Sequence, residues 1–319
     1  MKILCSISPI SPRWKNFFAG TALMAASATW ATAQTDGTWN FEGGGNWSDV
    51  TKWVDSEIAD GLGATALFTP TASLTADAIV VLDSSGTLTN LTFQRGPGAA
   101  TTSPRWTLNT ANDAILTLDG DNPGLFTNGR INATINAPIV FGGNGTGSAV
   151  IHAENTVSGD NPSMTINSSI TLQNRDLLLR GSFDTDTING NITGTGNVTV
   201  NRDNNNRTLF LLGANNDFSG SFTVANNNTV VELLSLPDNV VLNMTGGQLM
   251  LRNGADIRVS SINGSGFIRD QAGGNNTSHL RLNVQNGLVE QVDARMGDQL
   301  SQSQSQLLQR GRRRRRIEQ

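Results

Sequence analysis

Residues 188–234 read INGNITGTGNVTVNRDNNNRTLFLLGANNDFSGSFTVANNNTVVELL, and this stretch decides the fold class. Short runs within it alternate apolar residues with Thr, Ser or Asn; the apolar pairs are Val198 and Val200, Phe222 and Val224, and Val231 and Leu233. A period of two places successive side chains on opposite faces of a strand, so each run predicts a half-buried β-strand. Gly or Asn closes each run, and these residues adopt left-handed backbone angles at low cost, which allows sharp turns. The stretch therefore predicts one module of a β-solenoid.

The rest of the chain repeats this pattern more loosely. Runs such as AIVVL at residues 78–82 and AILTL at residues 114–118 have the same character. The turn signals between such runs lie too close together for helical crossovers between parallel strands. In TLTNLTF at residues 87–93, Leu88 and Leu91 fall out of strict alternation, which predicts a bend or a β-bulge.

A β-sandwich also fits short strands at nearly regular spacing, but two observations favour a solenoid. No two-residue hairpin pattern dominates, and SINGSGFI at residues 261–268 echoes residues 187–198, both reaching G-x-G before an apolar residue. We predict an all-β chain in which residues 66–286 form a β-solenoid, specifically a right-handed parallel β-helix. Stacked coils would let aliphatic residues stack inside and Asn side chains form ladders along the turns.

Composition supports this class. Hydrophobic residues make up 37% and charged residues 15% of the 319 residues, and both fractions are low for a compact globular enzyme. The chain has 34 Gly and no Tyr. Between the N-terminal leader and the Arg-rich end, acidic residues outnumber basic ones. Nucleic acid is therefore not an expected partner, because its binding needs a basic face.

Residues 1–33 have the features of a secretory signal peptide. These features are the basic residues Lys2, Arg13 and Lys15, a mostly apolar or small stretch at residues 17–30, and the small-x-small site Ala31-Thr32-Ala33 before Gln34. A transmembrane anchor is the alternative, but the apolar run is shorter than the roughly 20 residues that a spanning helix needs. The single cysteine, Cys5, lies in this leader, so the mature chain is expected to have no thiol, no disulfide and no membrane span.

Residues 34–65 form a Trp- and Gly-rich N-terminal unit with Trp39, Trp47 and Trp53. One interpretation is a cap that hides the first coil of the solenoid, since solenoid ends need atypical covering segments. The other is a carbohydrate platform in which the rings stack on sugar faces. Trp106, which follows a loop at residues 95–104, is a fourth candidate contact for carbohydrate.

Residues 287–319 differ from the rest. Val289, Val292, Met296 and Leu300 fall at helical spacing and predict a short amphipathic helix. A low-complexity SQSQSQ run and an Arg-rich run follow. The arginines are interpreted as part of a disordered tail or an out-of-frame end, and alternatively as a binding segment for anionic lipid or polysaccharide.

The sequence offers little catalytic chemistry. His152 and His279 are the only histidines, and they occur without H-E-x-x-H, G-x-S-x-G or phosphate-loop spacing, so no metal or other cofactor is expected. Paired carboxylates remain as a possible calcium site or acid/base pair, because residues i and i+2 on a strand share a face. The candidates are Asp113, Asp119 and Asp121 around one strand, and Asp184 with Asp186. Ordinary surface and turn aspartates are the expected interpretation.

LGANNDFSGSFTV at residues 212–224 resembles the autotransporter-associated β-strand repeat, L-x-G-x-N-[TS]-Y-[TS]-G-x-T-x-[VI], with Phe218 in the position of Tyr. I-x-G-x-G at residues 192–196 is similar to the usual lead-in of that repeat. WNFEGGGNWSDVTKW at residues 39–53 is similar to the Trp-rich opening of exported bacterial proteins that carry it. The resemblance implies a right-handed parallel β-helix on an exported passenger and no catalytic residues. The outer-membrane barrel of an autotransporter has at least eight strands, and the residues after Val284 do not predict one, so we expect no export through a barrel of this chain's own.

Together these observations predict a non-enzymatic structural or adhesive β-helix, exported to the periplasm, cell surface or exterior of a bacterium. Surface polysaccharide or another envelope component is the expected partner. A carbohydrate-binding module of the cell surface is the first alternative, and a polysaccharide lyase or hydrolase is the second.

Overall fold

The computed structural model describes residues 34–40, 43–69, 77–94, 105–129, 131–154, 163–181, 186–202, 208–252, 254–270, 278–284 and 288–292. The predicted signal peptide and residues 293–319 lie outside the described residues. The fold is that of the unit Ala33–Gln319.

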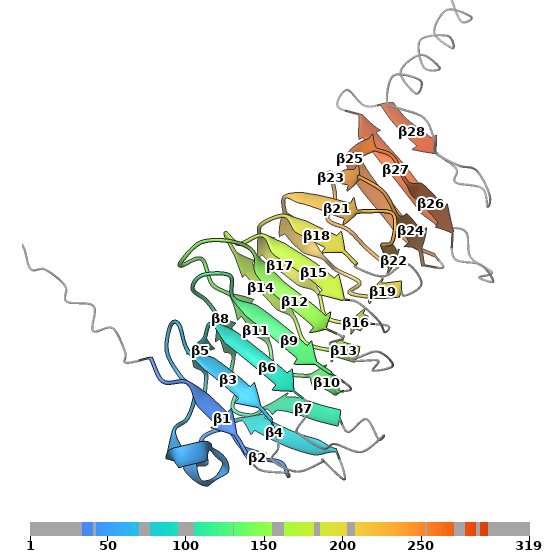
Figure 1. Cartoon of the computed structure of the whole chain (residues 1–319). Helices are drawn as coiled ribbons and strands as arrows, with labels where there is room; N and C mark the ends of the chain where they lie inside the picture. Colours follow the sequence, from blue (N-terminus) through green and yellow to red (C-terminus); the bar gives the residue numbers. More distant parts are fainter. Residues whose placement is uncertain are drawn as a thin grey trace, which may run out of the picture. The chain divides into compact units, whose positions relative to one another are not determined.

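Three sheets make up this unit, and their strands run parallel except for the last strand of the first sheet (Figure 1). Sheet I holds, in spatial order, β1 (Gly37–Trp39), β3 (Thr65–Phe68), β6 (Asn90–Gln94), β9 (Gly124–Asn128), β12 (Ala149–Glu154), β15 (Leu177–Gly181), β18 (Val198–Asn201), β21 (Ser221–Ala225), β23 (Val240–Met244), β25 (Asp256–Gly264), β27 (His279–Val284) and β28 (Leu288–Val292). Sheet II holds β2 (Gly45–Asn46), β4 (Ala78–Leu82), β7 (Arg105–Thr110), β10 (Asn132–Ile135), β13 (Ser163–Ile166), β16 (Asp186–Ile188), β19 (Thr208–Leu211), β22 (Val230–Leu233), β24 (Gln248–Leu251) and β26 (Phe267–Asp270). Sheet III holds β5 (Gly86–Leu88), β8 (Leu116–Leu118), β11 (Ile139–Phe141), β14 (Ile170–Gln173), β17 (Ile192–Thr195) and β20 (Asp217–Ser219).

The chain visits the three sheets in rotation, so each coil adds one strand to each sheet and the next coil stacks on it. β3, β4 and β5 form one such coil, and β6, β7 and β8 pair with them in the same order. This winding is a parallel β-helix, which confirms the predicted fold class; its right-handedness stays a prediction.

The core runs continuously through the stacked coils because the inward residues of successive strands lie in register. Leu116, Ile139 and Ile170 pair across sheet III, and all three are fully buried. The alternating pairs of residues 188–234 behave as predicted: Val198, Val200, Phe222, Val224, Val231 and Leu233 are all fully buried. Alternation therefore identified both the strands and their inward faces.

The irregularity at residues 87–93 is a corner with a bend at Thr89, so the predicted bend is confirmed, and the alternative of a β-bulge is not what the structure has there. Leu88 ends β5 in sheet III and Leu91 lies in β6 of sheet I, with Thr89 between the two strands. Both leucines are buried. The two residues between them let the chain change sheets, so both side chains still point into the core.

Sheet III ends at β20, and later coils contribute strands to sheets I and II alone within the described residues. In the first of these coils the chain passes from β22 to β23 through residues 234–239. Ser235 ties this short return to the last three-sheet coil: its hydroxyl donates to the Gly213 carbonyl at 2.7 Å, and its own carbonyl accepts from Asn216 Nδ2 at 3.1 Å.

The sequence echo between residues 187–198 and 261–268 is not a structural repeat. Residues 192–196 enter sheet III through β17, whereas residues 261–268 pass from β25 of sheet I to β26 of sheet II. G-x-G marks a corner in both places, because Gly194 and Gly264 have positive φ angles, but the corners join different sheets.

The helix predicted from Val289 onward is wrong where the structure describes the chain. Leu288–Val292 is β28, which pairs antiparallel with β27. The edge of β27 offers unpaired backbone groups, and pairing with that edge satisfies them, which overrides a weak helical pattern. Met296 and Leu300 lie outside the described residues.

Candidate functional site

The four tryptophans nominated as carbohydrate contacts lie in the core. Their exposed fractions are 0% for Trp39, 4% for Trp47, 4% for Trp53 and 0% for Trp106. Sugar stacking needs an open ring face, and these rings have none, so the structure contradicts their nomination.

Trp39, Trp47 and Trp53 instead pack together at the start of the stack, and Trp106 on β7 packs against Phe68 and Phe93. The ring centroid of Trp39 lies 5.3 Å from that of Trp53 and 5.5 Å from that of Phe68, and Trp47 and Trp53 lie 5.0 Å apart. The indole Nε1 of Trp53 donates to the Trp47 carbonyl at 2.8 Å. Two short 3-10 helices, η1 (Val50–Lys52) and η2 (Val54–Ser56), flank Trp53 in the chain. The burial is what a cap over the start of the core requires.

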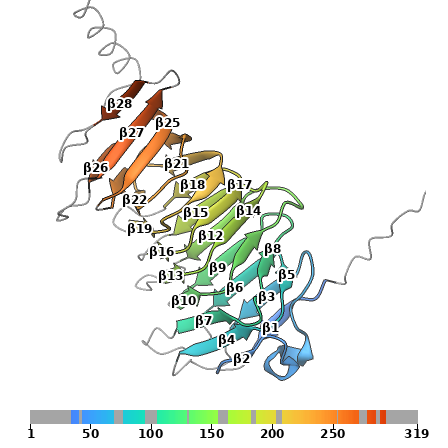
Figure 2. The same ribbon diagram turned by 180° about the vertical axis from the view of Figure 1, so that it is seen from behind.

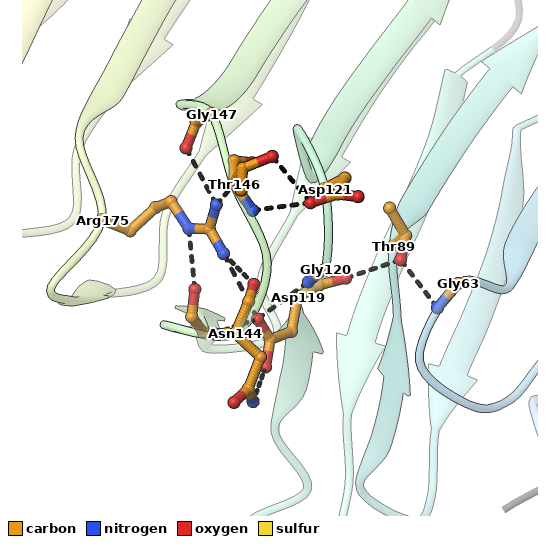
Figure 3. A network of polar contacts seen from close by, with 10 residues as sticks. Gly63, Thr89, Asp119, Gly120, Asp121, Asn144, Thr146, Gly147 and Arg175 are labelled. Carbon is orange, nitrogen blue, oxygen red and sulfur yellow. Dashed lines mark hydrogen bonds and ion pairs between the residues drawn. The ribbon is translucent and has the colours of Figure 1, made fainter. Parts of the chain in front are cut away.

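Asp119, one of the nominated carboxylates, belongs to a buried network at the corner where the chain passes from sheet III to sheet I (Figure 3). Its Oδ1 lies 3.5 Å from Arg175 Nη2, and the two side chains are 7% and 3% exposed. Oδ1 also accepts from the backbone N–H groups of Gly120 and Asn144 at 2.8 and 2.9 Å. Asn144 Nδ2 donates to Oδ2 at 2.6 Å. This carboxylate is fully engaged inside the protein.

Arg175 holds the flexible-looking GGNGTGS loop of the preceding coil. Its Nε donates to the Gly142 carbonyl at 2.9 Å, its Nη1 to the carbonyls of Thr146 and Gly147 at 2.9 and 2.8 Å, and its Nη2 to the carbonyl of Asn144. A guanidinium is suited to this role because its donors form a rigid planar fork. The arginine adds to the few backbone bonds of this loop, which include those from Gly120 N–H to the Asn144 carbonyl and from Asn122 N–H to the Thr146 carbonyl.

The same network crosses several coils. Asp121 accepts from the Thr146 N–H at 2.6 Å and from its hydroxyl at 2.9 Å. These two bonds, the backbone one first, lower the pKa of Asp121 below its ordinary value. Thr89 donates to the Asp119 carbonyl at 2.6 Å and accepts from the Gly63 N–H at 2.8 Å. We call the set Gly63, Thr89, Asp119, Asp121, Asn144, Thr146 and Arg175 the corner network.

The second nominated pair is also structural. Asp186 points inward from β16, and its Oδ2 lies 2.5 Å from Arg202 Nη1, with the two side chains 9% and 1% exposed. Its Oδ1 accepts from the Met164 N–H at 2.9 Å. Asp184 lies outside the described residues, so the proposed pairing of the two carboxylates has one described member.

The remaining candidates are dispersed. Asp113 occupies a turn with φ of 54°, while His152 and His279 lie on β12 and β27 of sheet I, and five strands of that sheet lie between them. In the part of the chain that the structure describes, no three His, Cys, Asp or Glu side chains gather as a metal site would require. No helix in that part has the length and apolar character needed to cross a membrane.

The feature that best qualifies as a functional surface is a polar array on the outer face of sheet II. Four threonines occupy matching positions on successive strands, and each is the register partner of the next: Thr107 on β7, Thr134 on β10, Thr165 on β13 and Thr187 on β16. The neighbouring core residues on these strands are buried, so alternation directs the threonines outward, and all four are half-exposed. In Figure 2 the four strands follow one another along one side of the stack.

A row of asparagines runs beside the threonines, two residues further along each coil. Asn136 Nδ2 donates to Asn109 Oδ1 at 2.7 Å, Asn167 Nδ2 to Asn136 Oδ1 at 2.8 Å, and Asn189 Nδ2 to Asn167 Oδ1 at 2.7 Å. This ladder confirms the expectation that Asn side chains stack along the turns. The sequence separations are 27, 31 and 22 residues, and this irregularity hid the alignment of the two rows from sequence reasoning.

The fold and these surfaces define a parallel β-helix with an internally satisfied polar framework. Comparisons with protein-family models, curated proteins and solved structures found no match to this chain. The resemblance to the autotransporter-associated repeat therefore stays a prediction that rests on residues 192–224 and on the Trp-rich opening.

Proposed function

We propose that this chain is an exported, non-enzymatic β-helix that acts as a structural or adhesive scaffold at the bacterial envelope. The observation that carries the proposal is the burial and pairing of two aspartate side chains. Asp119 and Asp186, two of the aspartates considered as acid/base groups, are buried, and each is bound by an arginine and by at least one backbone N–H group. A general acid or nucleophile has to reach a substrate, and these two groups are bound to partners inside the protein.

The scaffold role also fits the continuous core. Each coil buries its inward residues against the coil before and after it, so stability is distributed along the stack, as in other solenoids. The ladder and the corner network add polar bonds between coils that a purely apolar stack would lack.

Export rests on the features of residues 1–33 and can be tested directly. The full chain, expressed in a Gram-negative host with a C-terminal tag, should appear outside the cytoplasm with its N-terminus at Gln34. A matched variant with Lys2, Arg13 and Lys15 replaced by Glu should stay in the cytoplasm, because the leader then lacks its basic region. An exported protein whose sequence starts at Met1, or a cytoplasmic wild type, would contradict the proposal.

The absence of enzymatic activity is tested separately. Purified protein should release no reducing ends or unsaturated products from a panel of acidic and neutral polysaccharides. Release that survives Asp119→Asn and Asp186→Asn would mean that a different site acts; release that these variants abolish would overturn the structural role assigned to the two carboxylates.

A further inference from the structure

We propose that the polar array on sheet II is a binding surface for a neutral, linear polysaccharide that lies along the stacking direction of the coils. The array is the Thr row (Thr107, Thr134, Thr165, Thr187) together with the Asn row (Asn109, Asn136, Asn167, Asn189). The inference names a partner for the proposed scaffold, but it stands on its own surface and does not need export to be correct.

The chemistry of the array selects the class of ligand. Neither row contains an ionisable side chain, although acidic residues outnumber basic ones in the body of the chain. Hydroxyl and carboxamide groups donate and accept hydrogen bonds at once, as sugar hydroxyls do. Asn136 and Asn167, the two middle members of the row, each use one N–H and one oxygen lone pair in the ladder. Each amide has a second N–H and a second lone pair that a ligand can bind. A charged polymer would find no counter-charge on these rows.

The periodicity of the array selects a polymer over a small molecule. Neighbouring coils place equivalent side chains about 4.8 Å apart, and two residues along a strand advance by about 6.7 Å. The groups therefore recur at steps comparable to the advance of an extended glycan per sugar. The array is a sheet face and not a concave pocket, so a single sugar would be held weakly. A chain that contacts several coils gains affinity through linked contacts.

The array is also prepared for binding. Threonine side chains are stiff at χ1 because they are β-branched, and the ladder bonds fix the asparagine amides. Little conformational freedom is then lost when a ligand is bound.

The edges of the Thr row are apolar. Ile79, which is 50% exposed, pairs with Thr107 at one end, and Phe210, which is half-exposed, pairs with Thr187 at the other. Phe210 gives the array a ring beside its last hydroxyl, where the apolar face of a sugar can pack. The four buried tryptophans therefore gave the wrong location for the carbohydrate contact, and the array supplies a different one.

The test is glycan binding by purified protein, measured by calorimetry and by co-sedimentation with insoluble polymers. The probes are cello- and manno-oligosaccharides of two and six sugars, insoluble cellulose and mannan, and polygalacturonate as a charged control. We expect at least one neutral series to bind, with the hexamer binding at least tenfold more tightly than the dimer, and no preference for polygalacturonate.

The decisive variant is Thr134→Val with Thr165→Val, which removes two hydroxyls but keeps the shape and the β propensity of the strands. Each lost neutral hydrogen bond should weaken binding by about threefold to tenfold. The matched control is Thr117→Val with Thr171→Val, which makes the same two replacements on the outer face of sheet III. There Thr117 pairs with Thr87 and Thr171 pairs with Val140 on the adjacent strands. Circular dichroism and melting temperature verify that both variants fold.

Three results would overturn the proposal. No binding of any neutral polymer by the folded wild type would do so, as would equal binding by the two double variants. The third is wild-type self-association that the sheet II variant abolishes, because the array would then be an interface between copies of this chain. None of these results bears on export, which is tested by the N-terminal sequence.

Discussion

Replacing Arg175 by Met is the sharpest test of the corner network. The arginine side chain is 3% exposed, lies 3.5 Å from the Asp119 carboxylate, and donates to four backbone carbonyls of the loop between β11 and β12. Methionine fills a similar volume but offers no donor. The substitution therefore leaves a buried carboxylate without its counter-charge and removes the arginine donor from four carbonyls, of which those of Asn144 and Thr146 keep a backbone N–H donor.

Breaking a buried ion pair by removing one partner typically costs about 3–5 kcal/mol, and we expect Arg175→Met to lower the free energy of unfolding by that amount. The matched control is Arg281→Met. Its arginine also forms an ion pair, to Asp256 at 2.7 Å, but the two side chains are 29% and 42% exposed. Pairs on the surface contribute about 0–1 kcal/mol, so this variant should remain close to the wild type.

Urea denaturation measures the free energy of unfolding of the whole chain, and hydrogen exchange measures the free energy of local opening. Both are needed because solenoids can unfold in parts. The amides of Asn144 and Thr146 donate to Asp119 and Asp121, so their exchange should accelerate in Arg175→Met. Adding Asp119→Asn to Arg175→Met should recover part of the loss, since the uncompensated charge is removed. A loss below about 1 kcal/mol in the single variant, with unchanged exchange at residues 142–148, would refute the structural role of Arg175.

The other predictions concern the cap, a corner and a carboxylate. Trp39→Ala should destabilise the fold by about 3–5 kcal/mol because the ring is fully buried, whereas Val54→Ala at an exposed position should change it by less than about 0.5 kcal/mol; equal effects in chemical denaturation would contradict the cap. Gly194→Ala should cost about 1–3 kcal/mol because φ is +96° and a Cβ there overlaps the Leu172 carbonyl, while Gly86→Ala meets nothing closer than 4.0 Å and should be tolerated. Because Thr146 lowers the pKa of Asp121, the ionised form of Asp121 stabilises the fold above the ordinary value of about 3.9, and that contribution is lost as the pH falls through the lowered pKa. The melting temperature of the wild type should therefore drop more steeply below that pH than the melting temperature of Asp121→Asn, and parallel curves would exclude this linkage.

Local patterns in the sequence were sufficient to predict the strands and their inward faces. Val198 and Val200 alternate with polar residues and are buried, as the period of two requires. Leu88 and Leu91 are separated by two corner residues, and there the pattern predicted a bend or a β-bulge. The pattern alone does not distinguish a bulge from a change of sheet. At Val289 the helical spacing of apolar residues predicted a helix, but the segment is a strand because it pairs with the edge of β27.

The polar features were harder to predict because they join residues of different coils. Asp119 lies close to Arg175, and Asn136 to Asn167, only once the length of each coil is known, and that length varies with the loops. The tryptophans were misjudged for a different reason. A Trp-rich segment next to Gly fits either an exposed platform or a buried cap, and only packing against Phe68 decides between them.

The end of sheet III at β20 divides the stack into two parts with different resistance to opening. A coil that belongs to three sheets is joined to its neighbour by three sets of backbone bonds and three rows of inward side chains, whereas a coil after β20 has two of each in the described residues. In a linear array the free energy for detaching a terminal unit is set by its contact with the adjacent unit. Under tension or heat, the coils should therefore detach one after another from β27 back toward β21, and detachment should slow where the third sheet begins. The Trp-capped part then acts as the anchor of the molecule and the two-sheet part as its compliant segment.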